Sequence, residues 1–552
     1  MASGNGGQLM AHALKREGVE VLFTLCGGHI TPAYLAADEL GIRVIDFRHE
    51  QAAAMAADAL ARLSRRPQVA LVTAGPGVTN AVTAVANAAA ADSPLVLIGG
   101  KSPFYNLEQG SLQEMEQVDM FRPITCWARS CWETRRIPEY VEMAFRHART
   151  QRAPVFLEVP TDLLYGFGEA ELPPPLSPAH WGGRPPADPA LVEQAARLLA
   201  QSERAVLLAG STVWWDDAAA ALQALAEQAH LPVYTNGMGR GCMPPEHPLF
   251  FQLTRGQALG EADAVVLIGV PLDFRMGYGR NLGEHTRLIR IENRAERLAH
   301  VRAPAVGLCG DARAVLEQLC VALAAEGGGG AAARSARQGW VQALRAAEEH
   351  KRAAQREQGR SDQVPISHQR LAQEIADLVD ADTVVVGDGG DIVGCAAKYI
   401  PVPAPGHWLD PGPFGCLGVG PPFALAAKLF WPHKKVILLS GDGALGLNGF
   451  DLDTAIRHRL PFVTVVGNDG GWGQIRNPQT QMFGEQRTLA CELEFSRYDR
   501  FIEAFGGRGE RVERPEQIRP ALERALAAET CALVDVVISK HTMAGSNYMR
   551  GL

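Results

Sequence analysis

At 552 residues the chain is too long for a single hydrophobic core, and its length alone predicts three or four domains. Its 47% hydrophobic and 21% charged residues are ordinary for a globular protein, and a net charge of −8 without basic clusters argues against a nucleic-acid partner. The ten cysteines show no CxxC or zinc-type spacing, so neither a disulfide framework nor a cysteine metal cluster is indicated.

The chain shows no targeting or membrane segment. Residues 1–7 have neither the basic region nor the apolar run of a signal peptide. No stretch of about 18 apolar residues occurs, as a transmembrane helix would need. We therefore expect a cytoplasmic protein that has no membrane partner and keeps its thiols free.

Residues 1–170 alternate short apolar runs with helical patterns, and glycine-rich turns follow most of the runs. Continuous apolar runs separated by helices favour a parallel sheet covered on both faces. The expected strands of this first domain are Val19–Leu25, Val44–Phe47, Val69–Thr73, Leu95–Gly99 and Val155–Val159.

Two further blocks repeat this pattern. A proline-rich linker over 171–190 leads to a central domain at 191–325, and a second linker with a charged helix covers 326–364, ahead of a last domain at 365–552. The fold class predicted is α/β, with three consecutive doubly wound parallel-sheet domains. Expected strands in these blocks are Ala205–Leu208, Val233–Thr235, Ala264–Ile268, Leu288–Glu292, Thr383–Gly387, Val436–Ser440, Phe462–Gly467 and Ala532–Ile538.

Two polar motifs follow neighbouring strands of the last domain. Gly441-Asp442-Gly443 comes directly after one strand, and Asn468-Asp469 follows the next, with residues 444–467 between them. Mg²⁺ prefers oxygen ligands and commonly shares its coordination shell with phosphates. Glycines let a backbone approach a diphosphate closely, and a helix expected from near Leu447 would offer N–H groups to it.

This pair of motifs resembles the signature of the thiamine-diphosphate enzyme superfamily, whose second motif is usually Asn-Asn. The resemblance implies thiamine diphosphate and Mg²⁺ as cofactors, with Asp442, Asp469 and the backbone carbonyl of Gly471 as metal ligands. It places the diphosphate beside Gly390, Asp391, Gly443 and Ala444. Asp469 departs from the usual asparagine, and we expect Mg²⁺ to offset its additional charge.

Glu50 is the main catalytic candidate. Arg48-His49-Glu50 follows a predicted strand and opens an alanine-rich helix, where an acid also simply stabilises the first turn. The segment "RHEQAAAMAADALAR" is similar to the corresponding part of acetolactate synthases. The resemblance implies that Glu50 hydrogen-bonds the aminopyrimidine N1′ and favours the tautomer that deprotonates the thiazolium, while the cofactor carries the chemistry.

Other site residues follow from the same resemblance. Benzaldehyde lyase has a histidine and a glutamine in the sequence contexts of His29 and Gln113, which makes them partners of a substrate hydroxyl; a histidine here is also commonly structural. Gly415 would accept from the 4′-amino group, and Leu417 would either bend the cofactor or be core packing. Gly28, Pro76 and Trp472 complete the predicted cofactor contacts, with Trp472 either lining the pocket or packing beneath it.

Longer segments point to one branch of the superfamily. "DFRMGYGR", "GDGGDIVG", "WLDPGPFGCLGVG" and "VGNDGGW" resemble the acetolactate-synthase-like branch that contains 2-hydroxyacyl-CoA lyases, related to benzaldehyde lyase and oxalyl-CoA decarboxylase. The resemblance implies cleavage of a 2-hydroxyacyl-CoA to formyl-CoA and an aldehyde or ketone, or the reverse condensation. The alternatives are acetolactate synthase, a benzaldehyde-lyase-type carboligase, and a homologue without turnover.

The central domain is the expected nucleotide site. Arg275 and Arg280 follow one of its strands and suit a phosphate or diphosphate, either from the ADP part of CoA or from FAD; they are also ordinary surface residues. The resemblance further implies acyl-CoA and carbonyl substrates, a C-terminal lid from about His541, and a cofactor shared between two chains. We therefore expect a homodimer at minimum and a homotetramer as the full assembly.

Overall fold

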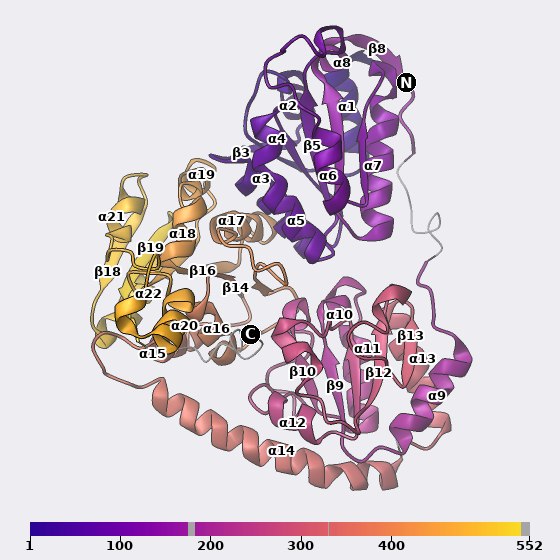
Figure 1. The fold of residues 1–552 in the computed structure, drawn as a ribbon, viewed down its shortest axis with the longest axis vertical. Helices are drawn as coiled ribbons and strands as arrows, with labels where there is room; N and C mark the ends of the chain where they lie inside the picture. The colour runs from indigo at the N-terminus through magenta and orange to yellow at the C-terminus, as the bar shows by residue number, and fades with distance from the viewer. Residues whose placement is uncertain (175–182, 329, 542–552) are drawn as a thin grey trace.

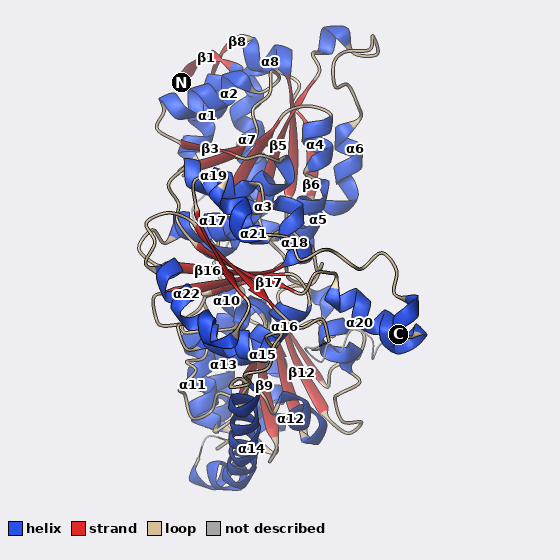
Figure 2. Ribbon diagram, turned by 90° about the vertical axis from the view of Figure 1, so that its left-hand side faces the viewer, coloured by secondary structure: helices blue, strands red, loops and turns tan. Residues whose placement is uncertain are grey.

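The computed structural model describes residues 1–174, 183–328 and 330–541, and these form three domains with a parallel sheet each (Figure 1). The prediction of three α/β parallel-sheet domains is therefore confirmed. Helices flank the strands of the sheets, as Figure 2 shows. The predicted linker at 171–190 lies partly outside the described residues, and the predicted lid beyond residue 541 lies wholly outside them.

The first domain has a six-stranded parallel sheet of order β3-β2-β4-β5-β7-β6. Buried residues of α1, α2 and α7 cover one face, and those of α3 and α5 cover the other. A short antiparallel ribbon, β1 with β8, lies beside this sheet. The elements are β1 (Ala2–Asn5), α1 (Gly6–Arg16), β2 (Val21–Thr24), α2 (Thr31–Glu39), β3 (Arg43–Asp46), α3 (Glu50–Ser64), β4 (Gln68–Val72), α4 (Pro76–Asn80), α5 (Val82–Ala90), β5 (Leu95–Lys101), α6 (Gln117–Phe121), β6 (Trp127–Ser130), α7 (Ile137–Gln151), β7 (Val155–Pro160), α8 (Thr161–Tyr165) and β8 (Phe167–Ala170).

The central domain has a five-stranded parallel sheet of order β10-β9-β11-β12-β13, and a long helix, α14, runs from it to the last domain (Figure 1). Its strands are fully buried near the middle of the sheet, which explains their continuous apolar runs. The elements are α9 (Pro189–Ala200), β9 (Ala205–Ala209), α10 (Ser211–Trp215), α11 (Ala219–Ala229), β10 (Val233–Thr235), α12 (Arg255–Glu261), β11 (Ala264–Ile268), β12 (Arg287–Glu292), β13 (Val306–Cys309), α13 (Ala312–Ala325) and α14 (Ala331–Gln358).

The last domain has a six-stranded parallel sheet of order β15-β14-β16-β17-β19-β18. Its central strands β16 and β17 are neighbours, so their carboxyl ends lie at the same edge. The elements are α15 (His368–Ala376), β14 (Thr383–Asp388), α16 (Asp391–Tyr399), β15 (Trp408–Leu409), α17 (Gly420–Phe430), β16 (Lys435–Gly441), α18 (Asp442–Asn448), α19 (Asp451–Arg457), β17 (Val463–Asn468), α20 (Gly473–Phe483), α21 (Tyr498–Glu503), β18 (Arg508–Val512), α22 (Ile518–Leu526) and β19 (Ala532–Val537).

The first and last domains share one hydrophobic core, built where α3 packs on α17. Both helices are rich in buried alanines, which let the two backbones approach closely. A buried ion pair reinforces the contact: Arg62 donates to Asp58 at 2.6 Å and also to the Asp410 carbonyl at 2.9 Å. Because Glu50 is the first residue of α3, this packing fixes its position.

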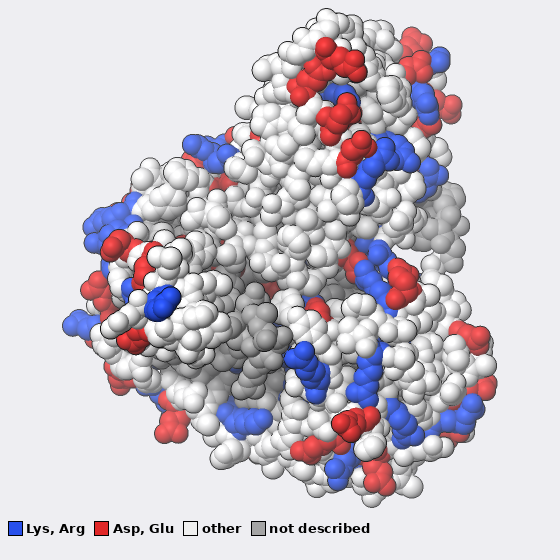
Figure 3. Space-filling model, viewed as in Figure 1, with Lys and Arg blue, Asp and Glu red and all other residues white. Residues whose placement is uncertain are grey.

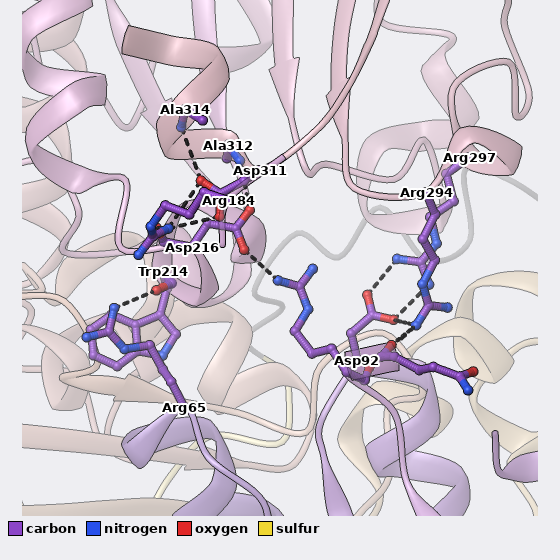
Figure 4. A network of polar contacts seen from close by, with 12 residues as sticks. Arg65, Asp92, Arg184, Trp214, Asp216, Arg294, Arg297, Asp311, Ala312 and Ala314 are labelled. Carbon is purple, nitrogen blue, oxygen red and sulfur yellow. Dashed lines mark hydrogen bonds and ion pairs between the residues drawn. The ribbon is translucent and has the colours of Figure 1, made fainter. Parts of the chain in front are cut away.

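The central domain contacts the first domain through ion pairs (Figure 4), and its Met238 and Trp214 pack against the core that the first and last domains share. Arg152 donates to Asp216 at 2.8 Å, and Arg297 of the central domain pairs with Asp92 at 2.6 Å. Acidic and basic side chains are interspersed on the face shown in Figure 3, without a continuous basic stripe. Within the described residues, none of the helices combines the length and apolar character that crossing a bilayer requires.

Candidate active site

The predicted metal ligands meet at the edge where β16 and β17 end. The helix expected from near Leu447 begins earlier, because Gly441 serves as its N-cap and α18 starts at Asp442 itself. Asp442 accepts from the backbone N–H groups of Gly443 at 2.9 Å and Gly471 at 3.0 Å. The carboxylate is thus held in place by backbone donors.

Asp442 and Asp469 form a buried pair of like charges. Burial, followed by the charge of Asp469, raises the pKa of Asp442 to about 7, and burial also raises the pKa of Asp469. Two neighbouring carboxylates of this kind favour a cation between them. Within the described part of the chain, no cluster of three or more His, Cys, Asp or Glu side chains could hold a metal, so further ligands here would be backbone, water or phosphate oxygens.

Arg476 was not predicted from the sequence, yet it pairs with Asp469. Its guanidinium donates to Asp469 Oδ2 at 2.5 Å and to the Lys540 carbonyl at 3.1 Å, and both charged side chains are largely buried. The additional charge of the unusual aspartate is therefore balanced by the protein itself, and one carboxylate oxygen of Asp469 is left for a cation. The only signal in the sequence is an arginine seven residues after Asp469, which is too common to interpret.

A pocket of about 460 Å³ opens beside this pair and contains the predicted cofactor contacts of the last domain. His368 and Gln474 also line it and were not predicted. The lining includes Gly390, Asp391, Gly415, Leu417, Asp442, Gly443, Ala444, Asp469, Gly471 and Trp472.

The glycines of this pocket fit a closely bound diphosphate. A Cβ on Gly443 would lie 2.7 Å from the Trp472 ring, so Trp472 both lines the pocket and covers this glycine. Gly415 has a φ of +68°, which an L side chain rarely adopts. Two acidic ligands, a backbone carbonyl at Gly471 and a glycine cradle together match what Mg²⁺ and a diphosphate require.

Asp388 positions the loop that carries Gly415 and Leu417. It is fully buried, and its two oxygens accept from the N–H groups of Gly418 at 3.1 Å and Gly420 at 2.8 Å. Burial raises the pKa of Asp388 to about 6, although both hydrogen bonds oppose the shift.

We expect the substitution Asp388→Asn to make the free energy of unfolding less dependent on pH. A raised carboxyl pKa means that the folded state binds the proton more tightly than the unfolded chain, so the contribution of Asp388 is full below about pH 4 and is lost as pH rises towards about 6. The stability of the native protein relative to Asp388→Asn should therefore fall across this range and level off above it. Urea unfolding midpoints between pH 4 and 8 measure this, and a difference independent of pH would contradict it.

Glu50 lies in a second cluster, at the sheet edge of the first domain. It is 6% exposed, and its Oε2 accepts from Asn80 Nδ2 at 2.9 Å. His49 caps the helix by accepting from the Gln51 N–H at 3.1 Å. A Cβ on Gly77 would lie 2.8 Å from Thr73 Cγ2 and 3.4 Å from Glu50 Oε1, so this glycine lets the first turn of α4 pack on Thr73 beside the carboxylate.

His29 and Gln113 belong to the same cluster. His29 Nδ1 is 3.2 Å from Thr73 Oγ1, and burial lowers the pKa of His29, partly opposed by a hydrogen bond to the Leu112 backbone. The next residue, Gln113, has a φ of +62° and packs so closely on Gly75 that a Cβ there would lie 2.8 Å from Gln113 Cβ. The exposed Gly28 adjoins His29.

Gln117 organises this cluster and was missed from the sequence. It is buried, accepts from the Gly75 N–H at 2.7 Å, and donates to the Gly100 carbonyl and to Glu158 at 2.8 Å each. Glu158 in turn pairs with Lys101 at 2.8 Å. Nothing in the local sequence distinguishes Gln117 from other glutamines, because its partners come from distant strands.

The two clusters do not share a pocket within one chain. The described residues that line the pocket at Asp442 come from the central and last domains, with none from the first. Glu50, His29 and Gln113 therefore lie apart from the predicted metal ligands in the single chain.

A separate cavity of about 420 Å³ lies where the three domains meet. Arg275 lines it together with Arg290 and Arg297, and Arg275 pairs with Asp273 at 2.6 Å. Arg280 is not part of the described lining; its guanidinium lies 5.7 Å from the Tyr278 ring centre. Phe414 lines both this cavity and the pocket at Asp442, so the two adjoin.

Comparisons with known proteins agree with this layout. Three family models match: the N-terminal TPP (thiamine pyrophosphate) binding domain of thiamine pyrophosphate enzymes at residues 4–120, their central domain at 192–319 and their C-terminal TPP binding domain at 388–536. A "Probable acetolactate synthase" of Mycobacterium bovis is 41% identical over 97% of this chain and 95% of its own length. "2-hydroxyacyl-CoA lyase 2" is 35% identical in Caenorhabditis elegans (97% of this chain, 90% of the relative) and in Homo sapiens (92% and 84%).

Proposed function

Because this chain belongs to the thiamine pyrophosphate enzyme family, we propose that it is a Mg²⁺-dependent 2-hydroxyacyl-CoA lyase. It would cleave a 2-hydroxyacyl-CoA to formyl-CoA and an aldehyde or ketone, or join the products in reverse. The observation that carries this proposal is the grouping of His29 and Gln113 with Glu50 at one sheet edge. Thiamine diphosphate, when bound, supplies a nucleophilic carbon and an electron sink.

In this proposal the last domain holds the cofactor's phosphates. Asp442, Asp469 and the Gly471 carbonyl would hold Mg²⁺, and the backbone at Gly443 would leave room for the diphosphate. Arg476 keeps Asp469 oriented, and Asp388 keeps the loop at Gly415 closed against the pocket. These residues bind and orient; they move no proton in the reaction.

The first domain would carry the proton transfers. Glu50 would hydrogen-bond the pyrimidine of the cofactor from its largely buried position, where water competes little. His29 accepts the proton of the substrate's 2-hydroxyl group, since its lowered pKa keeps the imidazole neutral, and Gln113 orients that hydroxyl.

A complete site then needs two chains, with the first domain of one facing the last domain of its partner. The separation of the two clusters within one chain supports this arrangement. Exposed apolar side chains on the first and last domains also support it, among them Leu112, Trp132, Leu447 and Phe450. We propose a homodimer as the active unit and a homotetramer as the assembly.

The cavity at Arg275 would take the nucleotide end of the acyl-CoA. It adjoins the cofactor pocket at Phe414, so one extended molecule would reach from the three arginines to the reaction centre. FAD is the alternative occupant of this cavity.

Acetolactate synthase is the second candidate, favoured by the 41% identity to the Mycobacterium bovis protein of that description. The two candidates share the cofactor and differ in substrate. Bound FAD, with its yellow absorbance, and acetolactate formed from pyruvate alone would favour this alternative.

Purified protein with thiamine diphosphate and Mg²⁺ is expected to release formyl-CoA from a 2-hydroxyacyl-CoA. His29→Asn should lower kcat about 100-fold, because the hydroxyl proton loses its acceptor. Mass spectrometry of the CoA products measures the release of formyl-CoA by the native protein and its slower release by His29→Asn. If no 2-hydroxyacyl-CoA in a series of chain lengths yields formyl-CoA, the proposed substrate class is wrong.

A further inference from the structure

A third cavity, of about 230 Å³, lies between the central and last domains, away from the catalytic clusters. It is bounded by the end of β10 and the start of α12 on one side, and by the end of α16 on the other (Figure 1). Three cationic side chains line it, Arg240, Arg255 and Lys398, and its described lining includes no aspartate or glutamate. The described lining of the cavity is therefore basic.

The fold accounts for Arg240. Its guanidinium lies 5.1 Å from the Trp408 ring centre, and Nη1 donates to the Ala397 carbonyl at 3.0 Å. Gln252 donates to the same carbonyl at 2.9 Å, so the two side chains hold the last turn of α16. Lys398 lies in that turn, where a cation suits the helix dipole.

Arg255, in contrast, has no such partners within the described residues. Within the described residues it makes no hydrogen bond or ion pair, although Phe250, Phe251 and Tyr234 surround the cavity that it lines. Burial lowers the pKa of Arg255, and the charge of Arg275 lowers it further. An arginine that has no partner beside other cations is available to an anion.

We propose that this cavity binds the phosphate or diphosphate group of a small molecule. Arginine forks suit phosphate oxygens, and two of them here face a space closed between two domains. The volume lies below the range of pockets that enclose a whole drug-sized ligand, so the cavity fits a free phosphate or one phosphate-bearing end of a larger molecule.

Helix α16 also links this cavity to the cofactor pocket at Asp442. Gly390 and Asp391, at the start of α16, line the cofactor pocket, while Ala397 and Lys398, near its end, line this cavity. An anion bound at one end of the helix would therefore restrain residues at the other. The proposal does not depend on which carbonyl reaction the enzyme catalyses.

Calorimetric titration of inorganic phosphate into the holoenzyme tests the proposal, because thiamine diphosphate and Mg²⁺ then fill the diphosphate site, and Arg275→Gln reports on binding at the cavity of Arg275. At low ionic strength we expect binding that Arg255→Gln weakens at least 10-fold, since one charge-assisted hydrogen bond is lost. Arg204→Gln is the matched control: Arg204 lies on the same domain, 5.8 Å from the Trp340 ring centre, and its loss should leave the affinity unchanged.

Titration of CoA in the presence of phosphate identifies the molecule that carries the phosphate group. CoA that displaces phosphate, and binds more weakly to Arg255→Gln, assigns the cavity to the substrate; CoA that binds beside phosphate assigns it to a separate phosphorylated molecule. Without phosphate, Arg255→Gln should unfold at the same temperature as the native protein or higher, because an unpaired cation is removed. Absence of phosphate binding, or an affinity lowered by Arg275→Gln but not by Arg255→Gln, would overturn the proposal.

Discussion

Glu50→Gln is expected to lower kcat about 1000-fold while the protein still binds thiamine diphosphate. Glutamine can take the place of the carboxylate beside Asn80, but it cannot exchange a proton with the pyrimidine ring. The largely buried position of Glu50 also keeps water from replacing it. Steady-state kinetics, together with a calorimetric titration of the cofactor, separate the loss of turnover from any loss of binding.

Glu20→Gln is a suitable control, because Glu20 is an exposed acid of the same domain. Its replacement should change neither kcat nor cofactor affinity. Full activity of Glu50→Gln would contradict the proposed proton transfers. It would favour the alternative in which the protein does not carry out this chemistry.

Asp469→Asn is expected to destabilise the metal-free protein by about 3 kcal/mol, because it removes the nearest and most buried carboxylate partner of the Arg476 guanidinium and leaves it only the longer contact of 3.8 Å with Glu492. The same substitution should weaken Mg²⁺ binding, since the uncompensated cation would lie beside the metal. Arg476→Gln should also destabilise the fold by removing the cation from Asp469. Urea unfolding and Mg²⁺ titration measure the two effects.

The double variant Asp469→Asn, Arg476→Gln gives the decisive comparison. A neutral pair leaves no unpaired charge, so its loss of stability should be clearly smaller than the sum of the single variants. Arg500→Gln, which removes an exposed ion pair with Glu503, should change stability by less than about 1 kcal/mol. Additive single effects, or tighter Mg²⁺ binding by Asp469→Asn, would show that Arg476 does not balance Asp469.

Where strands are buried on both sides, local sequence was sufficient to predict them. β9 and β11 are apolar throughout because neighbours and helices enclose them, and the predicted strands overlap them closely. The strands missed from the three parallel sheets, β6, β13, β15 and β18, each lie at the edge of a sheet, although the edge strands β3 and β10 were predicted; both strands of the ribbon, β1 and β8, were missed as well. An edge strand has one neighbour, and where its residues are partly exposed no continuous apolar run marks it, as in β18; β15 is buried but only two residues long.

The candidate site, too, combines features that local sequence predicts with contacts that depend on the tertiary structure. Sequence by itself determined the carboxylates and glycines that follow β16 and β17, because strand ends and short motifs are local features. Only the tertiary structure decided their partners: Arg476 for Asp469, and Asp388 for the loop at Gly418. Those contacts join residues from different elements, and the burial that gives them their energy exists only once the domains have packed.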